Sequence, residues 1–181
     1  MRQIQFAQPQ ITIGIIAICV LVFGYQSLTG QDFALDFGLA GIAITEFGEY
    51  YRFITAMFLH AGLIHILFNM LILWQIGSVI ELSIGKLRYA VLYFACGLGG
   101  GIASVLFNDP FVLSVGASGA IFGLLGAYVV MAKKLNINHS QVLTLIFINL
   151  AIGFIVPGID WHAHLGGLIT GAAVASALPR R

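Results

Sequence analysis

The chain has 181 residues, of which 60% are hydrophobic and only 8% are charged, and its mean hydropathy is +1.00. A soluble domain carries about 25% charged residues. This composition therefore excludes an ordinary soluble enzyme and leaves no room for a separate soluble domain. We expect residues 1–181 to form a single multi-pass membrane domain, surrounded by lipids and without a nucleic-acid partner.

The first apolar stretch runs from about residue 9 to residue 28. It is too long for the core of a signal peptide, and no convincing small-residue cleavage site follows it, so we interpret it as a retained membrane span. Cys19 lies in this stretch and Cys96 in a later one, and neither belongs to a metal or redox motif. Both cysteines are expected to be core or lipid-facing residues.

Five further apolar windows of helical length follow along the chain. Together with the first they predict six transmembrane helices, because backbone groups in hydrocarbon must form their hydrogen bonds internally. The six windows cover residues 9–28, 60–81, 88–107, 117–132, 141–156 and 162–178. The predicted fold class is therefore an all-α membrane bundle.

One long connection, residues 29–59, separates the first two windows. It alternates polar breaks with apolar runs such as residues 33–37. Because a soluble loop would be more polar, we expect this connection to lie in the outer membrane interface, with its apolar side chains dipping into the lipid.

The distribution of charge predicts the orientation. With the N-terminus and the C-terminus inside, seven of the eight basic residues fall at inner helix ends, which is a strong positive-inside signal. Only Arg52 and Glu81 break the pattern, and the other acidic residues fall in outer segments. The seven inner basic residues are Arg2, Lys86, Arg88, Lys133, Lys134, Arg180 and Arg181.

Three polar clusters lie near the predicted outer ends of the second, fourth and sixth spans. At a rise of about 1.5 Å per residue, each lies within roughly 15 Å of the outer end of its helix. Polar groups inside a membrane cost free energy and usually mark function, so we expect one water-accessible site. The clusters are His60, His65 and Asn69, then Gly116, Ala117, Ser118 and Gly119, then His162, His164 and Gly167.

The residue types in these clusters fit acyl transfer. Ser118 begins a span after Gly116, where unbonded backbone N–H groups can bind an anion. His65 and Asn69 are four residues apart, so they share a helix face and both can donate hydrogen bonds to a developing oxyanion. His164 could accept the Ser118 proton and later return it to a leaving amine.

Small residues indicate which spans pack together. Gly167 and Gly171 form a small-xxx-small pair on the same predicted helix as His164, and such pairs let helices approach closely. The expected partner is the glycine face of the fourth span. That face is formed by Gly119, Gly123 and Gly126.

Each of these polar residues also has a purely structural explanation. A serine in a membrane span usually bonds to its own helix, and Asn69 could simply bridge two helices. His60 and His162 could be interfacial residues, and Trp161 is expected to anchor a helix at the membrane interface. The co-location of the clusters, rather than any single member, favours a functional site.

Other functional classes can be compared with the motifs present. The chain has no HExxH helix, so we expect no zinc site, no other metal and no cofactor. An aspartyl protease needs two membrane aspartates, and Asp160 stands alone near a loop. A small channel, a transporter or a non-catalytic membrane chaperone with a polar cavity stays open as an alternative, although no inverted repeat indicates a transporter.

The motifs resemble those of the rhomboid family of intramembrane serine proteases, over nearly the whole chain. They stand in three spans, in the order and spacing of the six-span core of that family. The matching positions are His60, His65 and Asn69 in the second span, the Gly-x-Ser-Gly motif at residues 116–119, and His164, Gly167 and Gly171 in the last span.

The resemblance implies a Ser118–His164 catalytic dyad without an acidic third member. It also implies an oxyanion hole formed by His65, Asn69 and the Ser118 backbone N–H. Phe122 takes the place of an aromatic residue that stacks on the catalytic histidine in the family. Tyr51-Arg52 replaces a Trp-Arg pair, and Arg52 is expected to make the same structural bonds.

The implied activity is hydrolysis of transmembrane or juxtamembrane segments of membrane proteins. The resemblance implies that substrates enter from the side, where residues 141–156 and the loop 157–161 would move, and that small residues are favoured at the cleaved position. We expect a bacterial cytoplasmic membrane, with the site toward its outer side.

Overall fold

The computed structural model describes residues 8–30, 32–135 and 137–177, and over these residues the chain is almost entirely helical. Within these ranges there is no strand, only an isolated bridge between Leu39 and Ser114. The predicted inner residues Arg2, Arg180 and Arg181 lie outside the described residues. The helices are α1 (Gln10–Thr29), α2 (Asp32–Phe37), α3 (Gly41–Thr45), α4 (Arg52–Thr55), α5 (Leu63–Ile72), α6 (Ser78–Ile84), α7 (Lys86–Phe107), α8 (Ser118–Lys134), α9 (Ser140–Ile155) and α10 (Trp161–Ala177).

Several of these helices are strongly apolar. Three are long and apolar enough to cross a membrane, namely Gln10–Thr29, Leu63–Ile84 and Lys86–Phe107. The second of them joins α5 to α6 through a π-helical turn at Leu73–Gly77. The apolar helix α9 is shorter, with 16 residues.

The helix limits agree with the predicted windows to within a few residues, with one consequential difference. Helix α5 begins at Leu63 rather than at His60, because Gly62 before it has an extended backbone. His60 therefore lies in a non-helical segment that leads into α5 and not on the helix itself.

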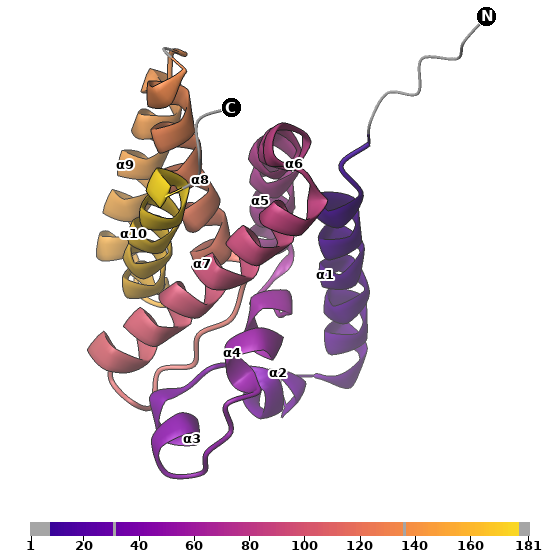
Figure 1. Ribbon diagram of the computed structural model, residues 1–181. Coiled ribbons are helices and arrows are strands. Elements are labelled where there is room, and N and C mark those ends of the chain that lie inside the picture. Colours follow the sequence, from indigo (N-terminus) through magenta and orange to yellow (C-terminus); the bar gives the residue numbers. More distant parts are fainter. Residues whose placement is uncertain (1–7, 31, 136, 178–181) are drawn as a thin grey trace, which may run out of the picture.

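The helices pack around α7, which crosses the middle of the molecule (Figure 1). Helices α8, α9 and α10 lie on one side of α7 and α1 lies on the other, while α2, α3 and α4 gather at one end. The start of α1 and the end of α10 lie toward the opposite end. The core includes Tyr89, Leu92, Tyr93 and Cys96 of α7, and Cys19 of α1 is buried beside them, so both cysteines are core residues.

The connection between α1 and α5 is folded and is held by Arg52. Its guanidinium donates from Nη1 to the carbonyl oxygens of Leu35 at 2.5 Å and Gly38 at 2.7 Å, and from Nε to Glu49 at 2.6 Å. The side chain is buried by these contacts. This bonding explains why a basic residue stands on the predicted outer side of the membrane. Apolar side chains of the same connection, including Leu35 and Phe47, are exposed.

Glu81, the other exception to the charge pattern, binds the first turn of α1. Its carboxylate accepts hydrogen bonds from the backbone N–H groups of Ile11 at 2.9 Å and Thr12 at 2.8 Å, and from the Thr12 hydroxyl at 2.8 Å. Pro9 before this helix provides no side-chain cap. The buried carboxylate therefore supplies the cap from another helix, and its charge is favourable at a helix N-terminus.

We predict that Glu81→Ala lowers the free energy of unfolding by about 2 kcal/mol, because two N–H groups at the start of α1 lose a charged acceptor. Thermal unfolding in detergent measures the change. The matched control is Glu46→Ala, which removes an exposed carboxylate and should leave the midpoint nearly unchanged. Equal effects of the two substitutions would contradict the capping role.

Candidate active site

Ser118 stands at the start of α8, where the chain makes a tight approach to α5. Gly116 before it has a φ of 128°, which side chains rarely adopt, and its N–H donates to the Ala56 carbonyl at 2.9 Å. The first N–H groups of an α-helix have no acceptor within the helix. The N–H groups at the start of α8, beginning with that of Ser118, are therefore available to bind a developing negative charge.

The Ser118 hydroxyl meets His164 of α10. Its Oγ lies 3.0 Å from His164 Nε2, so the hydroxyl can donate its hydrogen to the imidazole. The imidazole stacks on Phe122 with a ring-centroid distance of 4.2 Å and an angle of 6°. Its Nδ1 is buried and has no hydrogen-bond partner among the described residues. A serine with a histidine at this distance is a nucleophile with an adjacent base.

Glycines bring α8 and α10 together. A methyl group added at Gly167 would collide with the carbonyl oxygen of Gly119, and one added at Gly171 would collide with that of Gly123. At each of these contacts the two backbones touch, which larger residues would prevent. The Ser118–His164 contact depends on this approach, because its two members stand on different helices.

His65 of α5 lies on the other side of Gly116. A methyl group added at Gly116 would lie 3.0 Å from His65 Nε2 and 3.7 Å from Ser118 Oγ, so both atoms border the same glycine. The Ala61 N–H donates to His65 Nδ1 at 3.4 Å. This acceptor role of Nδ1 places the hydrogen of a neutral imidazole on Nε2, the nitrogen that borders Gly116.

Asn69 follows one turn after His65 on α5 and is buried. Its Nδ2 donates to the His65 carbonyl at 2.8 Å, which leaves a second amide hydrogen for another acceptor. The expected sharing of a helix face by the two residues agrees with this geometry.

His60 is fully buried, so its side chain faces the interior of the bundle. Both of its ring nitrogens lack a partner among the described residues, and its ring lies edge-on to His65 with centroids 5.2 Å apart. The amide side chain of Gln26 on α1 binds its main chain, donating to the carbonyl at 2.8 Å and accepting from the N–H at 3.3 Å. Gln26 belongs to no motif, and its only signal in the sequence is an amide near the end of an apolar span.

His162 and Trp161 lie at the start of α10 but belong to a different contact. His162 Nδ1 lies 2.6 Å from Asn108 Oδ1, and its ring packs on Trp161 and on Phe107. His162 therefore joins the start of α10 to the end of α7.

A small cavity reaches Ser118 from inside the bundle. Its volume is about 30 Å³, enough for a water molecule. Its lining includes Gly116, Ser118, Ala163, Phe53 and Met57. Among the described residues no three histidine, cysteine, aspartate or glutamate side chains come together in a way that could hold a metal ion.

Comparison with known proteins identifies relatives over most of the chain. The pattern of the Rhomboid domain matches residues 47–181. Rhomboid protease GluP of Bacillus subtilis (strain 168) is 38% identical over 97% of this chain, and RHOMBOID-like protein 1 of Arabidopsis thaliana is 46% identical over 83%. A relative named Inactive RHOMBOID-like protein 8, also from Arabidopsis thaliana, is 40% identical over 74% of this chain.

The chain is much shorter than these relatives. The aligned part covers 36% of GluP and 39% of each of the two Arabidopsis proteins. The match therefore concerns the shared helical domain and not the remainder of those proteins.

We predict that Gly171→Ala separates α8 from α10, because the added methyl group has no space against the Gly123 carbonyl. Overpacking of this kind costs about 1–3 kcal/mol, and a shifted α10 also moves His164 away from Ser118. Unfolding in detergent and reaction of Ser118 with a fluorophosphonate should both show the loss. The control is Gly24→Ala on α1, where a methyl group meets nothing within 4 Å. A Gly171→Ala protein as stable and reactive as the control would refute the dependence on close approach.

Proposed function

This chain belongs to the rhomboid family of membrane proteins, and we propose that it is an intramembrane serine endopeptidase with a Ser118–His164 dyad. The observation that supports this most is the separation of 3.0 Å between Ser118 Oγ and His164 Nε2. Sequence similarity alone does not establish activity, because the relatives include one named as a protease and one named as inactive. The distance between the two side chains is therefore the stronger support.

In the proposed reaction, Ser118 Oγ attacks the carbonyl carbon of the scissile peptide bond while His164 Nε2 accepts the hydroxyl proton. The resulting imidazolium returns this proton to the leaving amine as the C–N bond breaks, which leaves an acyl-enzyme. His164 then takes a proton from a water molecule, and the hydroxide formed attacks the carbonyl carbon of the ester. The imidazolium returns this proton to Ser118 Oγ as the C–O bond of the acyl-enzyme breaks, which releases the carboxylic acid product and restores the serine hydroxyl.

In this proposal the developing oxyanion is held by donors from α5 and from the start of α8. These are the backbone N–H of Ser118, the Nε2 hydrogen of His65 and the free amide hydrogen of Asn69. Such donors stabilise the tetrahedral intermediate more than the planar substrate, and removal of one typically costs about 10²–10³ in rate. Gly116 serves this arrangement because a side chain there would occupy the space between His65 and Ser118.

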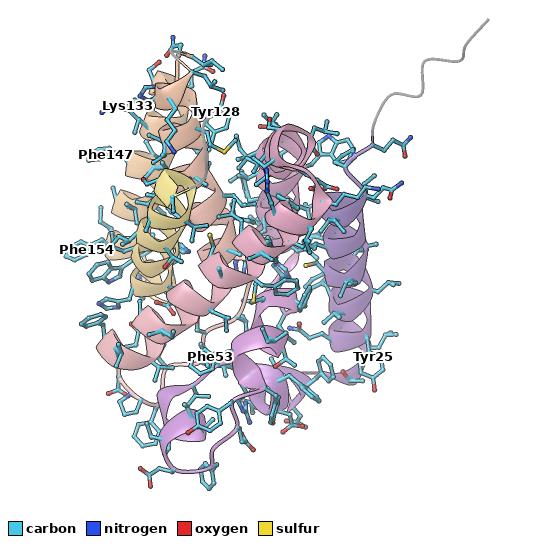
Figure 2. The ribbon with its side chains drawn as sticks, in the orientation of Figure 1. Tyr25, Phe53, Tyr128, Lys133, Phe147 and Phe154 are labelled. Atoms are coloured by element: carbon cyan, nitrogen blue, oxygen red, sulfur yellow. The ribbon has the colours of Figure 1, made fainter. Side chains whose placement is uncertain are left out.

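We further infer six membrane spans with both termini inside. The three shorter helices α8, α9 and α10, with 16 or 17 residues each, are near the lower limit for a span. Lys134 at the end of α8 donates to the Ala175 carbonyl near the end of α10, and Lys86 at the start of α7 donates to Gln10 at the start of α1. The lysines thus gather at one end of the bundle, with Lys133 opposite Tyr25 (Figure 2).

The inferred substrates are transmembrane or juxtamembrane segments of other membrane proteins. A substrate helix must unwind near the outer membrane surface, because the carbonyl of an intact helix is hydrogen-bonded and covered. Entry beside α9 is supported by its shallow packing: only Ile146 and Gly153 are buried along this helix, while Phe147 and Phe154 project outward (Figure 2).

We predict that Ser118→Ala and His164→Ala both abolish cleavage of a model transmembrane substrate by purified protein, and that Asn69→Ala lowers kcat by about 10²–10³. The measurement is single-turnover and steady-state cleavage in detergent or liposomes, with folding of each variant verified by thermal unfolding.

A fluorophosphonate probe supplies the control for this experiment. It should label wild-type protein at Ser118 but not Ser118→Ala. A folded wild-type protein that neither cleaves nor reacts with the probe would favour a non-catalytic membrane chaperone. A biological activity that survives Ser118→Ala would favour a channel or transporter.

The orientation can be tested by cysteine accessibility in intact bacteria. In a Cys19→Ala, Cys96→Ala background, a membrane-impermeant maleimide should label Tyr50→Cys in the connection between α1 and α5. It should label Lys133→Cys only after the membrane is permeabilised. The reverse result would invert the proposed topology.

A further inference from the structure

A directed chain of hydrogen bonds runs from the start of α10 across the end of α7 and back. His162 Nδ1 lies 2.6 Å from Asn108 Oδ1, Asn108 Nδ2 donates to Ser104 Oγ at 3.1 Å, and the Ser104 hydroxyl donates to Asp160 Oδ2 at 2.5 Å. With His162 donating from Nδ1, every donor in the chain points toward the next member, and the chain ends on the carboxylate of Asp160.

Asp160 is held in the charged form at the first turn of α10. Its Oδ1 accepts the backbone N–H of Ala163 at 2.9 Å, so the carboxylate also caps the helix. Burial raises the pKa of the Asp160 carboxyl, but hydrogen bonds from Ser104, Ala163, Ser114 and Asn108 outweigh burial and hold the pKa below its usual range. A negative charge at a helix N-terminus is favourable.

Asp160 stands one helical turn before His164. The His164 N–H donates to the Asp160 carbonyl at 3.3 Å, which is the i to i+4 bond of a helix. Asp160 stands just before the first residue of α10, and its carboxylate is close enough to attract a positive charge on the His164 imidazole. The carboxylate is therefore adjacent to the imidazole in space without being bonded to it.

The proposed reaction creates a positive charge on the His164 imidazole, and few groups around the ring can stabilise this charge. Phe122 covers one face of the imidazole, and Gly153 of α9 lies beside Nδ1, which has no hydrogen-bond partner among the described residues. The charged or titratable groups that act on the imidazole are Asp160, which attracts the charge, and His65, which opposes it. A buried charge without a partner is costly.

We propose that Asp160 is a positioning residue for this site, whose carboxylate stabilises the His164 imidazolium across one helical turn and fixes the start of α10 against α7. This inference rests on the proposed protease function. It gives the dyad an acidic partner that makes no contact with the histidine ring, with Ser104 and Asn108 holding that partner in place.

The simpler alternative is that Asp160 only caps α10. Asparagine is as good an N-cap as aspartate, and it can also bond to Ser104. Asp160→Asn therefore retains the cap and the shape of the side chain but removes the charge, which separates the two explanations.

The test is Asp160→Asn in the full chain, with cleavage of a model transmembrane substrate and the rate of fluorophosphonate labelling as readouts. We expect kcat and the labelling rate to fall together by about tenfold with KM nearly unchanged. The unfolding midpoint should fall slightly, because the charge of Asp160 also stabilises the start of α10. The matched control is Asp109→Asn, which removes an exposed carboxylate from the loop after α7 and should change neither rate.

Asp160→Glu provides the second variant, because it restores the charge with poorer capping geometry. It should be more active than Asp160→Asn, and activity no higher than that of Asp160→Asn would overturn the role of charge. If Asp160→Asn does not fold, the comparison of Asp160→Glu with Asp160→Ser carries the same test.

Wild-type rates in Asp160→Asn would overturn this inference and leave the protease function intact. A wild-type protein that neither cleaves the substrate nor reacts with the probe would instead overturn the proposed function, and this inference with it.

Discussion

The contact between the backbones of α8 and α10 is the constraint on which the rest of this molecule depends. Gly167 and Gly171 lie against the carbonyl groups of Gly119 and Gly123, where no side chain fits. Inside a membrane, helix association depends on such packing and on hydrogen bonds, because lipid is as apolar as the helix surfaces. Ser118 and His164 stand on two separate helices, so their side chains stay within hydrogen-bond distance only if the two helices pack closely in one fixed position.

The charged residues that lie inside the structure all bind the ends of helices or the connections between them. Glu81 caps α1 from α6, Arg52 holds the carbonyl groups of the connection before α5, and Asp160 caps α10. Each of these charges is matched by main-chain dipoles, which limits the cost of its burial. The residues closest to the proposed reaction, Ser118 and His65, carry no fixed charge. The site can therefore be polar without the desolvation cost of a permanent ion pair.

Charged residues that are bonded inside the protein do not report on membrane orientation. The positive-inside rule describes basic residues in loops that are free to interact with the membrane surface. Arg52 and Glu81 depart from the charge pattern because each forms hydrogen bonds to main-chain groups inside the protein. Membership of the rhomboid family, in turn, does not settle activity, since an inactive relative is as similar as others. The 3.0 Å separation of Ser118 Oγ and His164 Nε2 is the local feature that favours activity in this chain.

The apolar helices, the positions of the three polar clusters and the helix face shared by His65 and Asn69 could all be predicted from the amino-acid sequence. These features follow from local periodicity, which depends only on residues within a turn or two. The sequence also indicated the glycine faces of α8 and α10. The pairing of distant polar groups became visible only in the folded chain: Glu81 binds Thr12 across 69 residues, Gln26 binds His60 across 34, and Asp160 binds Ser104 across 56. A polar side chain does not specify its partner through local pattern, because long-range packing selects among several acceptors of equal chemistry. For the same reason His60 could be read as an interfacial residue, whereas packing against α1 and α5 buries it completely.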